Sequence, residues 1–190
     1  MNLRKSFFLF VLSFSIALPS VFAEPVVVYK LSKNLDKAKA SIKKKNKEVL
    51  KGSFAQGEII FPKLPRITSI KTRKVSGGAD SRTAISLLPI AENKRRIKFT
   101  EVTPGSHVKL SYYVEPSKTA ATEPATLYLS IWAGRHKLDR LVIVEEAGWH
   151  EKKYELGMVG FLLSPITLSF ELTVDQPVRA YLNFDAEVIR

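Results

Sequence analysis

Apolar and polar residues alternate along most of the chain after residue 52, in short runs that are separated by turn residues. The alternation is clearest in the segment VKLSYYV, at residues 108–114, where every second side chain is apolar or aromatic. It returns in the segment LYLSI, at residues 127–131. Successive side chains of a β-strand point to opposite faces, so this pattern predicts strands with one face buried and one face in water.

Runs of this kind predict strands along the whole of residues 53–190. They lie at residues 58–61, 66–75, 82–88, 95–102, 107–115, 125–133, 139–146, 150–156, 166–174 and 178–189. The segments between them, such as SGGADS, TPGS and DQP, are rich in turn-forming residues. About nine strands without helices between them predict an all-β fold, an antiparallel β-sandwich.

The segment before residue 53 has a different pattern and predicts one lysine-rich helix. Its apolar residues recur at helical spacing, at Leu31, Leu35, Ala38, Ile42 and Val49. Ser32 is suited to cap the start of a helix, and Gly52 to end it. Residues 24–52 are therefore expected to form a helical extension, and residues 53–190 the β-sandwich domain. Two interpretations stay open: the helix is dispensable for folding, or its apolar stripe completes the core.

The first 23 residues are expected to be a signal peptide. Arg4 and Lys5 give a basic start, and residues 7–18 form an apolar stretch. The small residues Val21 and Ala23 occupy the positions that a signal peptidase reads, so the mature chain is expected to start at residue 24. No other stretch reaches the ~18 apolar residues of a membrane-spanning helix. These features predict a periplasmic or secreted protein without a transmembrane segment after processing.

Charge and cysteine content narrow the possible functions. The chain has 30 lysine and arginine residues against 18 acidic residues, and nine of the lysines lie within residues 30–51. The chain has no cysteine, which excludes disulfides, thiolate metal sites and a cysteine nucleophile.

The lysine cluster can attract an anionic polymer or lipid headgroups by charge alone. The candidate contact residues are Lys39, Lys43, Lys44, Lys45 and Lys47. An exported protein seldom meets nucleic acid, so no nucleic-acid partner is expected. The other interpretation is a solvated segment without any partner.

Sequence signatures of enzymes are absent. The chain contains no GxSxG, HExxH or phosphate-binding loop. Glu145 and Glu146 are adjacent on a predicted strand, so their side chains point to opposite faces and do not act together. We therefore expect no catalysis and no cofactor. Only a carboxylate pair formed in space, as in glycoside hydrolases, stays open.

The second half of the chain resembles galactose-binding-like jelly-roll modules, the fold of many carbohydrate-binding modules. The segments that carry the resemblance are ATLYLSIWAG, LDRLVIVEEAGW, SPITLSFELTVD and AYLNFDAEVIR. Such modules often place Gly-Trp before a central strand and end on an apolar strand with an aspartate. The resemblance covers about residues 53–190 and implies a jelly-roll sandwich that binds a glycan or another envelope polymer. A weaker similarity to flagellar filament outer-layer (sheath) proteins implies instead a structural protein that assembles with other subunits.

The resemblance and the aromatic residues suggest a ligand site around Trp149. Trp149 lies on the opposite side of its strand from Tyr154, so it faces outward if Tyr154 faces the core. The candidate ligand-binding residues are Trp149, Tyr154, Arg135 and His136. The competing interpretations are that Trp149 caps the core and that Arg135 and His136 form a solvated turn. Trp132, inside an apolar run, is expected in the core.

Glu58 and Asp185 are the candidates for a structural calcium site of the kind found in carbohydrate-binding jelly rolls. Calcium needs six to eight oxygen ligands, so these two carboxylates do not make a site by themselves. The alternative is that both are ordinary solvated carboxylates.

Overall fold

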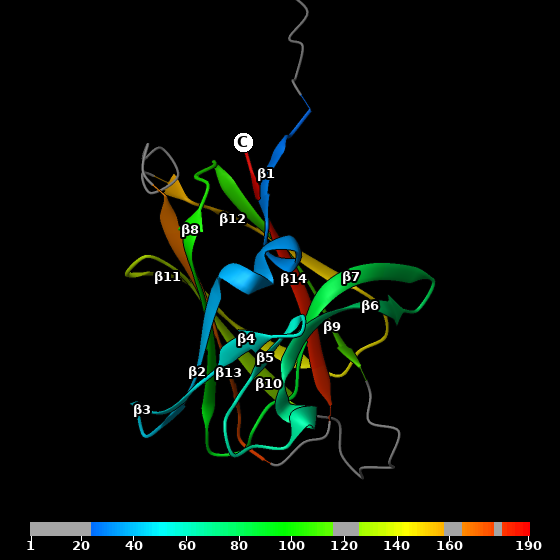
Figure 1. Cartoon of the computed structure of the whole chain (residues 1–190). Helices are drawn as coiled ribbons and strands as arrows, with labels where there is room; N and C mark the ends of the chain where they lie inside the picture. Colours follow the sequence, from blue (N-terminus) through cyan, green and yellow to red (C-terminus); the bar gives the residue numbers. More distant parts are fainter. Residues whose placement is uncertain (1–23, 116–125, 158–164, 177–179) are drawn as a thin grey trace, which may run out of the picture.

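The fold of the chain is a sandwich of two antiparallel sheets (Figure 1). The computed structural model describes residues 24–115, 126–157, 165–176 and 180–190. The predicted signal peptide at residues 1–23 lies outside the described residues. Within the described part of the chain, no helix is long and apolar enough to span a membrane.

Sheet A has eight strands. In spatial order they are β12 (His150–Glu155), β9 (His107–Glu115), β14 (Tyr181–Ile189), β7 (Asp80–Leu87), β6 (Ile70–Gly77), β5 (Glu58–Ile60) and β4 (Ser53–Ala55), and β1 (Val27–Lys30) also pairs with β14. Sheet B has six strands in the order β11 (His136–Val144), β10 (Thr126–Ala133), β13 (Ile166–Val174), β8 (Lys94–Val102), β2 (Ala38–Lys44) and β3 (Lys47–Lys51). Two short 3-10 helices, η1 (Leu31–Lys37) and η2 (Arg66–Thr68), complete the described elements.

The core lies between the two sheets and is built from the alternating apolar residues. On β10, the buried side chains are Leu127, Leu129, Ile131 and Ala133, and their neighbours along the strand face outward. Phe170 of β13 and Phe184 of β14 meet across the core with ring centroids 5.1 Å apart. The prediction of an all-β antiparallel sandwich is therefore confirmed, with fourteen strands in the described residues instead of about nine.

The predicted lysine-rich helix is wrong. Residues 31–37 form the short helix η1, and residues 38–51 form the hairpin β2–β3. Lys45 and Asn46 turn this hairpin with φ values of 47° and 65°, the left-handed conformation that a two-residue hairpin loop requires. Strand β2 pairs with β8 along its length, so its backbone groups are bonded in sheet B. The ladder and core burial outweigh the weak helical preference of a thin apolar stripe.

Candidate functional site

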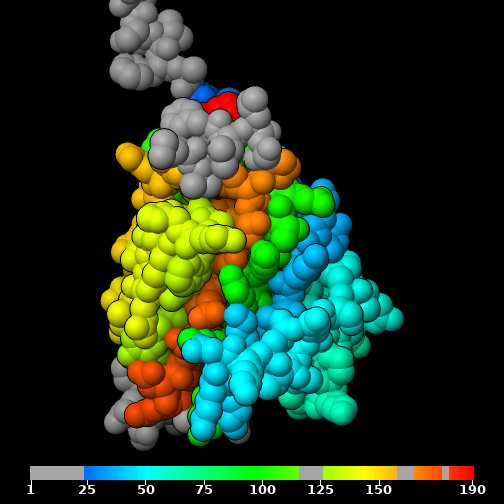
Figure 2. Space-filling model, turned by 90° about the vertical axis from the view of Figure 1, so that its left-hand side faces the viewer, coloured from blue at the N-terminus to red at the C-terminus, as the bar shows by residue number. Residues whose placement is uncertain are grey.

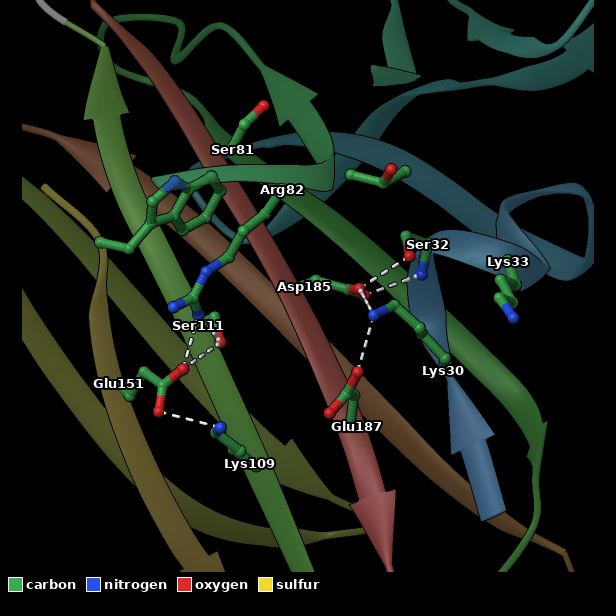
Figure 3. Close-up of a pocket in the computed structure, with 12 residues that line it drawn as sticks. Lys30, Ser32, Lys33, Ser81, Arg82, Lys109, Ser111, Glu151, Asp185 and Glu187 are labelled. Carbon is green, nitrogen blue, oxygen red and sulfur yellow. Dashed lines mark hydrogen bonds and ion pairs between the residues drawn. The ribbon is translucent and has the colours of Figure 1, made fainter. Parts of the chain in front are cut away.

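A cavity of about 520 Å³ opens on the outer face of sheet A, the face turned away from the core (Figure 3). Its lining comes from β1, η1, β7, β9, β12 and β14, together with Trp149, which immediately precedes β12. The volume lies in the range of about 300–1,000 Å³ that is usual for small-molecule sites. The floor is the central strand β14, whose outward-facing Asn183 and Asp185 are also buried.

The strand register brings the polar residues of the cavity together. Asp185 on β14 lies opposite Ser111 on β9, and Ser111 lies opposite Glu151 on β12. Neighbouring strands are about 4.8 Å apart, so these three residues form a row across the sheet. All three belong to the outward-facing set of their strands.

The first of two charge networks in the cavity is centred on Glu151. Its carboxylate pairs with Arg82 at 2.5 Å and with Lys109 at 2.9 Å. These two hydrogen-bonded cations hold the pKa of the Glu151 carboxyl below its ordinary value. Ser111 accepts a hydrogen bond from Arg82 at 3.1 Å. Glu151 is therefore ionised and oriented in the cavity.

The second network fastens the N-terminal segment to the sheet. The Asp185 carboxylate accepts hydrogen bonds from the backbone N–H of Ser32 at 2.9 Å and from its hydroxyl at 2.7 Å, and Lys30 lies 3.4 Å away. Lys30 also pairs with Glu187 at 2.6 Å. Burial raises the pKa of the Asp185 carboxyl, while the Ser32 hydrogen bonds and the charge of Lys30 act in the opposite direction. Figure 3 shows the two networks side by side on the sheet.

Trp149 stands at the wall of the cavity, on the outer face of sheet A. Its indole lies 5.7 Å from the ring of Tyr113, and the Arg82 guanidinium lies 5.4 Å from the indole centroid. Gly77 is required beside it, because a Cβ atom there would come within 2.8 Å of the indole Cδ1 and Nε1 atoms. Trp149 is half-buried and lies outside the core cluster. The interpretation that it caps the core is therefore not supported.

Tyr154 and Trp149 lie on opposite sides of the strand, as the alternation predicts. Tyr154 packs against the core, and its hydroxyl donates a hydrogen bond to Asp139 at 3.0 Å. Burial, with this hydrogen bond, raises the pKa of the Tyr154 hydroxyl. Tyr154 does not line the cavity that contains Trp149.

The remaining candidate residues lie elsewhere. Arg135 and His136 lie at the β10–β11 turn of sheet B, and the candidate lysines lie on β2, β3 and the turn between them.

Glu58 on β5 is three strands from β14, and it pairs with Arg66 at 2.6 Å and accepts a bond from Ser69. In the part of the chain that the structure describes, no three His, Asp or Glu residues are grouped as metal ligands. The structure therefore does not bring Glu58 and Asp185 together.

The expectation that Trp132 lies in the core is wrong. Trp132 belongs to the outward-facing set of β10 and is half-buried. The Lys137 ammonium lies 5.8 Å from the centroid of its ring. Trp132 sits in an apolar run because its neighbours Ile131 and Ala133 fill the core, while the indole covers the outer face of sheet B.

Sequence reasoning missed most of the cavity residues, although it named Trp149 and Asp185. The missed polar residues are Lys30, Ser32, Lys33, Ser81, Arg82, Thr83, Lys109, Ser111, Glu151 and Glu187. The sequence pattern could have placed three of them, because Lys109, Ser111 and Glu151 occupy positions of their strands that alternate with the core-facing residues. The alternation shows which face a side chain is on, but it does not show which strands are neighbours.

Comparison with known proteins identifies no family for this chain. No family model and no curated protein matches it. Among solved structures it is similar to the mannan-recognising carbohydrate-binding module TmCBM27, with 9% identity and a TM-score of 0.48 over 88% of this chain and 99% of that chain. A xylan-binding domain from Paenibacillus barcinonensis Xyn10C has 17% identity and a TM-score of 0.35 over 64% of this chain and 82% of that chain. A Stig cyclase from Fischerella sp. TAU has 12% identity and a TM-score of 0.46 over 79% and 97%, respectively. These three structures are thus two carbohydrate-binding domains and a cyclase.

Proposed function

We propose that the protein is an exported, non-catalytic module that binds a glycan in the cavity on the outer face of sheet A. The observation that carries the proposal is the convergence of a tryptophan with oriented carboxylates and cations in one cavity. Sugar hydroxyls both donate and accept hydrogen bonds, so a site with ionised donors and acceptors suits them. The apolar face of a sugar ring packs well against an aromatic wall such as Trp149.

The hydrogen bonds and ion pairs of Asp185 and Glu151 support ligand binding rather than catalysis. Asp185 is held by Ser32 and Lys30, and Glu151 is held by Lys109 and Arg82. A carboxylate fixed in this way, such as that of Glu151, acts as an oriented acceptor for ligand hydroxyl groups. The Asp185 oxygens are instead taken up by Ser32, Lys30 and the backbone N–H of Ala186, so Asp185 fixes the N-terminal segment beside the cavity.

The alternative from the sequence, a subunit of a surface assembly, needs an apolar interface. In the described parts of the chain the exposed large apolar side chains are spread over several elements, at Val26, Val27, Val49, Phe54, Ile67, Val142 and Val144. Val142 and Val144 share one face of the edge strand β11. This scattered distribution supports the ligand-binding proposal over the assembly proposal.

We expect Trp149→Ala to weaken glycan binding by about 1–3 kcal/mol, the share of an aromatic side chain central to an interface. The fold should survive, because Trp149 lies outside the core cluster. A polysaccharide array selects the ligand, and calorimetry with that ligand measures the loss. Phe54→Ala, at an exposed aromatic side chain of β4 that does not line the cavity, is the matched control and should leave the affinity unchanged.

Gly77→Ala gives a second variant, which keeps the tryptophan at position 149 but changes the position of its indole. The added methyl group displaces the indole, so it should also weaken binding of the selected glycan. Unchanged affinity in both variants, or an array without any bound glycan, would overturn the proposal. Loss of the thermal transition in Trp149→Ala would show instead that Trp149 supports the fold.

Residues 1–23 support the proposed export of the protein. The basic start, the apolar stretch and Ala23 support cleavage after Ala23. Mass spectrometry of protein recovered from outside the cytoplasm should therefore give a chain that starts at Glu24. A chain there that still carries Met1 would contradict the proposal.

A further inference from the structure

A second hollow, of about 420 Å³, lies on the outer face of sheet B over β2, β3 and β8. Figure 2 shows this face, with the orange β13 and green β8 between the yellow-green β10–β11 hairpin and the blue and cyan β2–β3 hairpin. We call this hollow the sheet-B groove. Five cations line it against a single carboxylate, that of Glu48: Lys39, Lys43, Lys51, Arg96 and Lys98.

The strand register forces these cations together. Lys39 on β2 lies opposite Lys98 on β8, and Ser41 lies between Arg96 on one side and Lys51 on the other. Like charges directly opposite one another on neighbouring strands destabilise a sheet. The fold therefore holds a concentration of positive charge that an external anion would neutralise.

The ion pairs between described residues leave most of this charge without a partner. Glu48 pairs with Lys51 at 3.5 Å. None of the ion pairs between described residues includes Lys39, Lys43, Arg96 or Lys98. Glu171 lies opposite Arg96 on the neighbouring strand, but its ion pair is with Lys94 at 3.6 Å.

Arg96 gives a second, independent sign of a missing ligand. Its Nε atom is buried and has no hydrogen-bond partner among the described residues. Its Nη2 atom donates only a long bond of 3.4 Å to Ser169. A buried polar atom without a partner is unfavourable, so a small shift of the Arg96 side chain toward a ligand oxygen would be favoured.

An aromatic side chain lies on the same face of sheet B, beyond the residues that line the groove. The register continues from Lys98 to Ser169 on β13 and from Ser169 to Trp132 on β10. The half-buried indole of Trp132 therefore lies in the same row as Lys39 and Lys98, on the same outer face. The row combines charges for anionic groups with an aromatic surface for a sugar ring.

We propose that the sheet-B groove binds a linear anionic polysaccharide, independently of the glycan site on sheet A. A flat lipid surface would meet the turn between β2 and β3, at Lys45 and Lys47, before it reached Arg96 and Lys98 on the interior strand β8. A single extended chain can follow the row from Lys39 through Lys98 to Trp132 across the strands. The two sites occupy opposite faces of the sandwich, so one molecule holds two chains at once.

The test compares two variants that each remove two positive charges. Arg96→Gln/Lys98→Gln removes charge inside the groove, and Lys45→Gln/Lys47→Gln removes it around the turn. Binding is measured to polygalacturonate, dextran sulfate and neutral dextran at several salt concentrations. The two anionic polymers distinguish carboxylate from sulfate recognition, and thermal melts check the fold of each variant.

We expect the unmodified protein to bind at least one anionic polymer, with affinity that falls as salt rises, and to ignore neutral dextran. The groove variant should bind about tenfold more weakly and with a shallower salt dependence, and the turn variant less than about threefold more weakly. Equal losses in both variants, or no binding to either anionic polymer, would overturn the proposal.

Two further measurements distinguish binding in the groove from binding to a membrane and from binding in the sheet-A cavity. Binding to anionic phospholipid vesicles that the turn variant loses and the groove variant keeps would overturn the proposal in favour of a membrane surface. Trp149→Ala should leave binding of the anionic polymer unchanged, and the groove variant should leave the sheet-A ligand unaffected. The two measurements therefore test the sheet-A cavity and the sheet-B groove separately.

Discussion

A protein shortened to begin at Ser53 is expected to lose cooperative folding. The truncation removes β1 from sheet A, β2 and β3 from sheet B, and η1 from the core. Leu31, Leu35 and Ile42, which are 0%, 3% and 2% exposed, go with it. Burial of three such side chains contributes about 5–9 kcal/mol, which is comparable with the whole stability of about 5–15 kcal/mol of a typical domain. The truncation also leaves β8 as an unpaired edge.

Thermal melts of proteins that begin at Glu24 and at Ser53 test this expectation. Two substitutions in the longer protein provide matched controls: Leu35→Ser should destabilise by about 2–5 kcal/mol, and Val49→Ser, at a side chain 51% exposed, by less than about 0.5 kcal/mol. A helix with a continuous apolar stripe would make both positions similar. If the shorter protein melts cooperatively at the same temperature, residues 24–52 are dispensable for folding, which is one of the two interpretations that the sequence left open.

The strands after residue 53 were predictable because most of them have one wet face. Their period of two is visible in segments such as residues 108–114, and the predicted strands there agree with the observed elements to within a few residues. The extra strands of the sandwich are those that the helix prediction hid or that are too short to show a period, such as Ser53–Ala55.

The wrong helix has a physical explanation in the spacing of its apolar residues. Residues i and i+4 share a face in a helix, because four residues make about one helical turn. They also share a face in a strand, because side chains alternate with a period of two residues. Ala38 and Ile42 therefore fit either structure, and Ala40 between them fits only the strand. The choice depends on the partner strand β8, more than 50 residues later in the chain.

The faces of the site residues were predictable, and their neighbours were not. The opposition of Trp149 to Tyr154 follows from alternation alone, and the structure agrees. The row of Asp185, Ser111 and Glu151 depends on β14, β9 and β12 being adjacent, which is a property of the strand order. The same limit explains why Glu58 and Asp185 were considered together although three strand positions separate them.

Arg95 is the residue whose substitution should be most damaging within the sandwich. It is fully buried, and its guanidinium donates hydrogen bonds to the carbonyl oxygens of Leu88 and Thr68. The guanidinium carbon also lies 5.1 Å from the centroid of the Phe61 ring. Burial lowers the pKa of the Arg95 guanidinium to about 10, so it is still charged at neutral pH. One side chain thus ties the segments after β7 and at η2 to the core face of β8.

We expect Arg95→Ala to lower the free energy of unfolding by about 3–5 kcal/mol, because it leaves a large cavity and removes the donors to two carbonyl groups. Arg95→Met keeps most of the volume without the charge, so it should cost about 1–3 kcal/mol, the cost of the lost hydrogen bonds. Arg96→Ala is the matched control on the outward side of the same strand and should cost less than about 1 kcal/mol. Urea unfolding at neutral pH measures all three. If Arg95→Ala and Arg96→Ala lose equally little unfolding free energy, Arg95 does not hold these segments together. If Arg95→Ala and Arg95→Met lose equally much, the effect comes from the two hydrogen bonds rather than from packing.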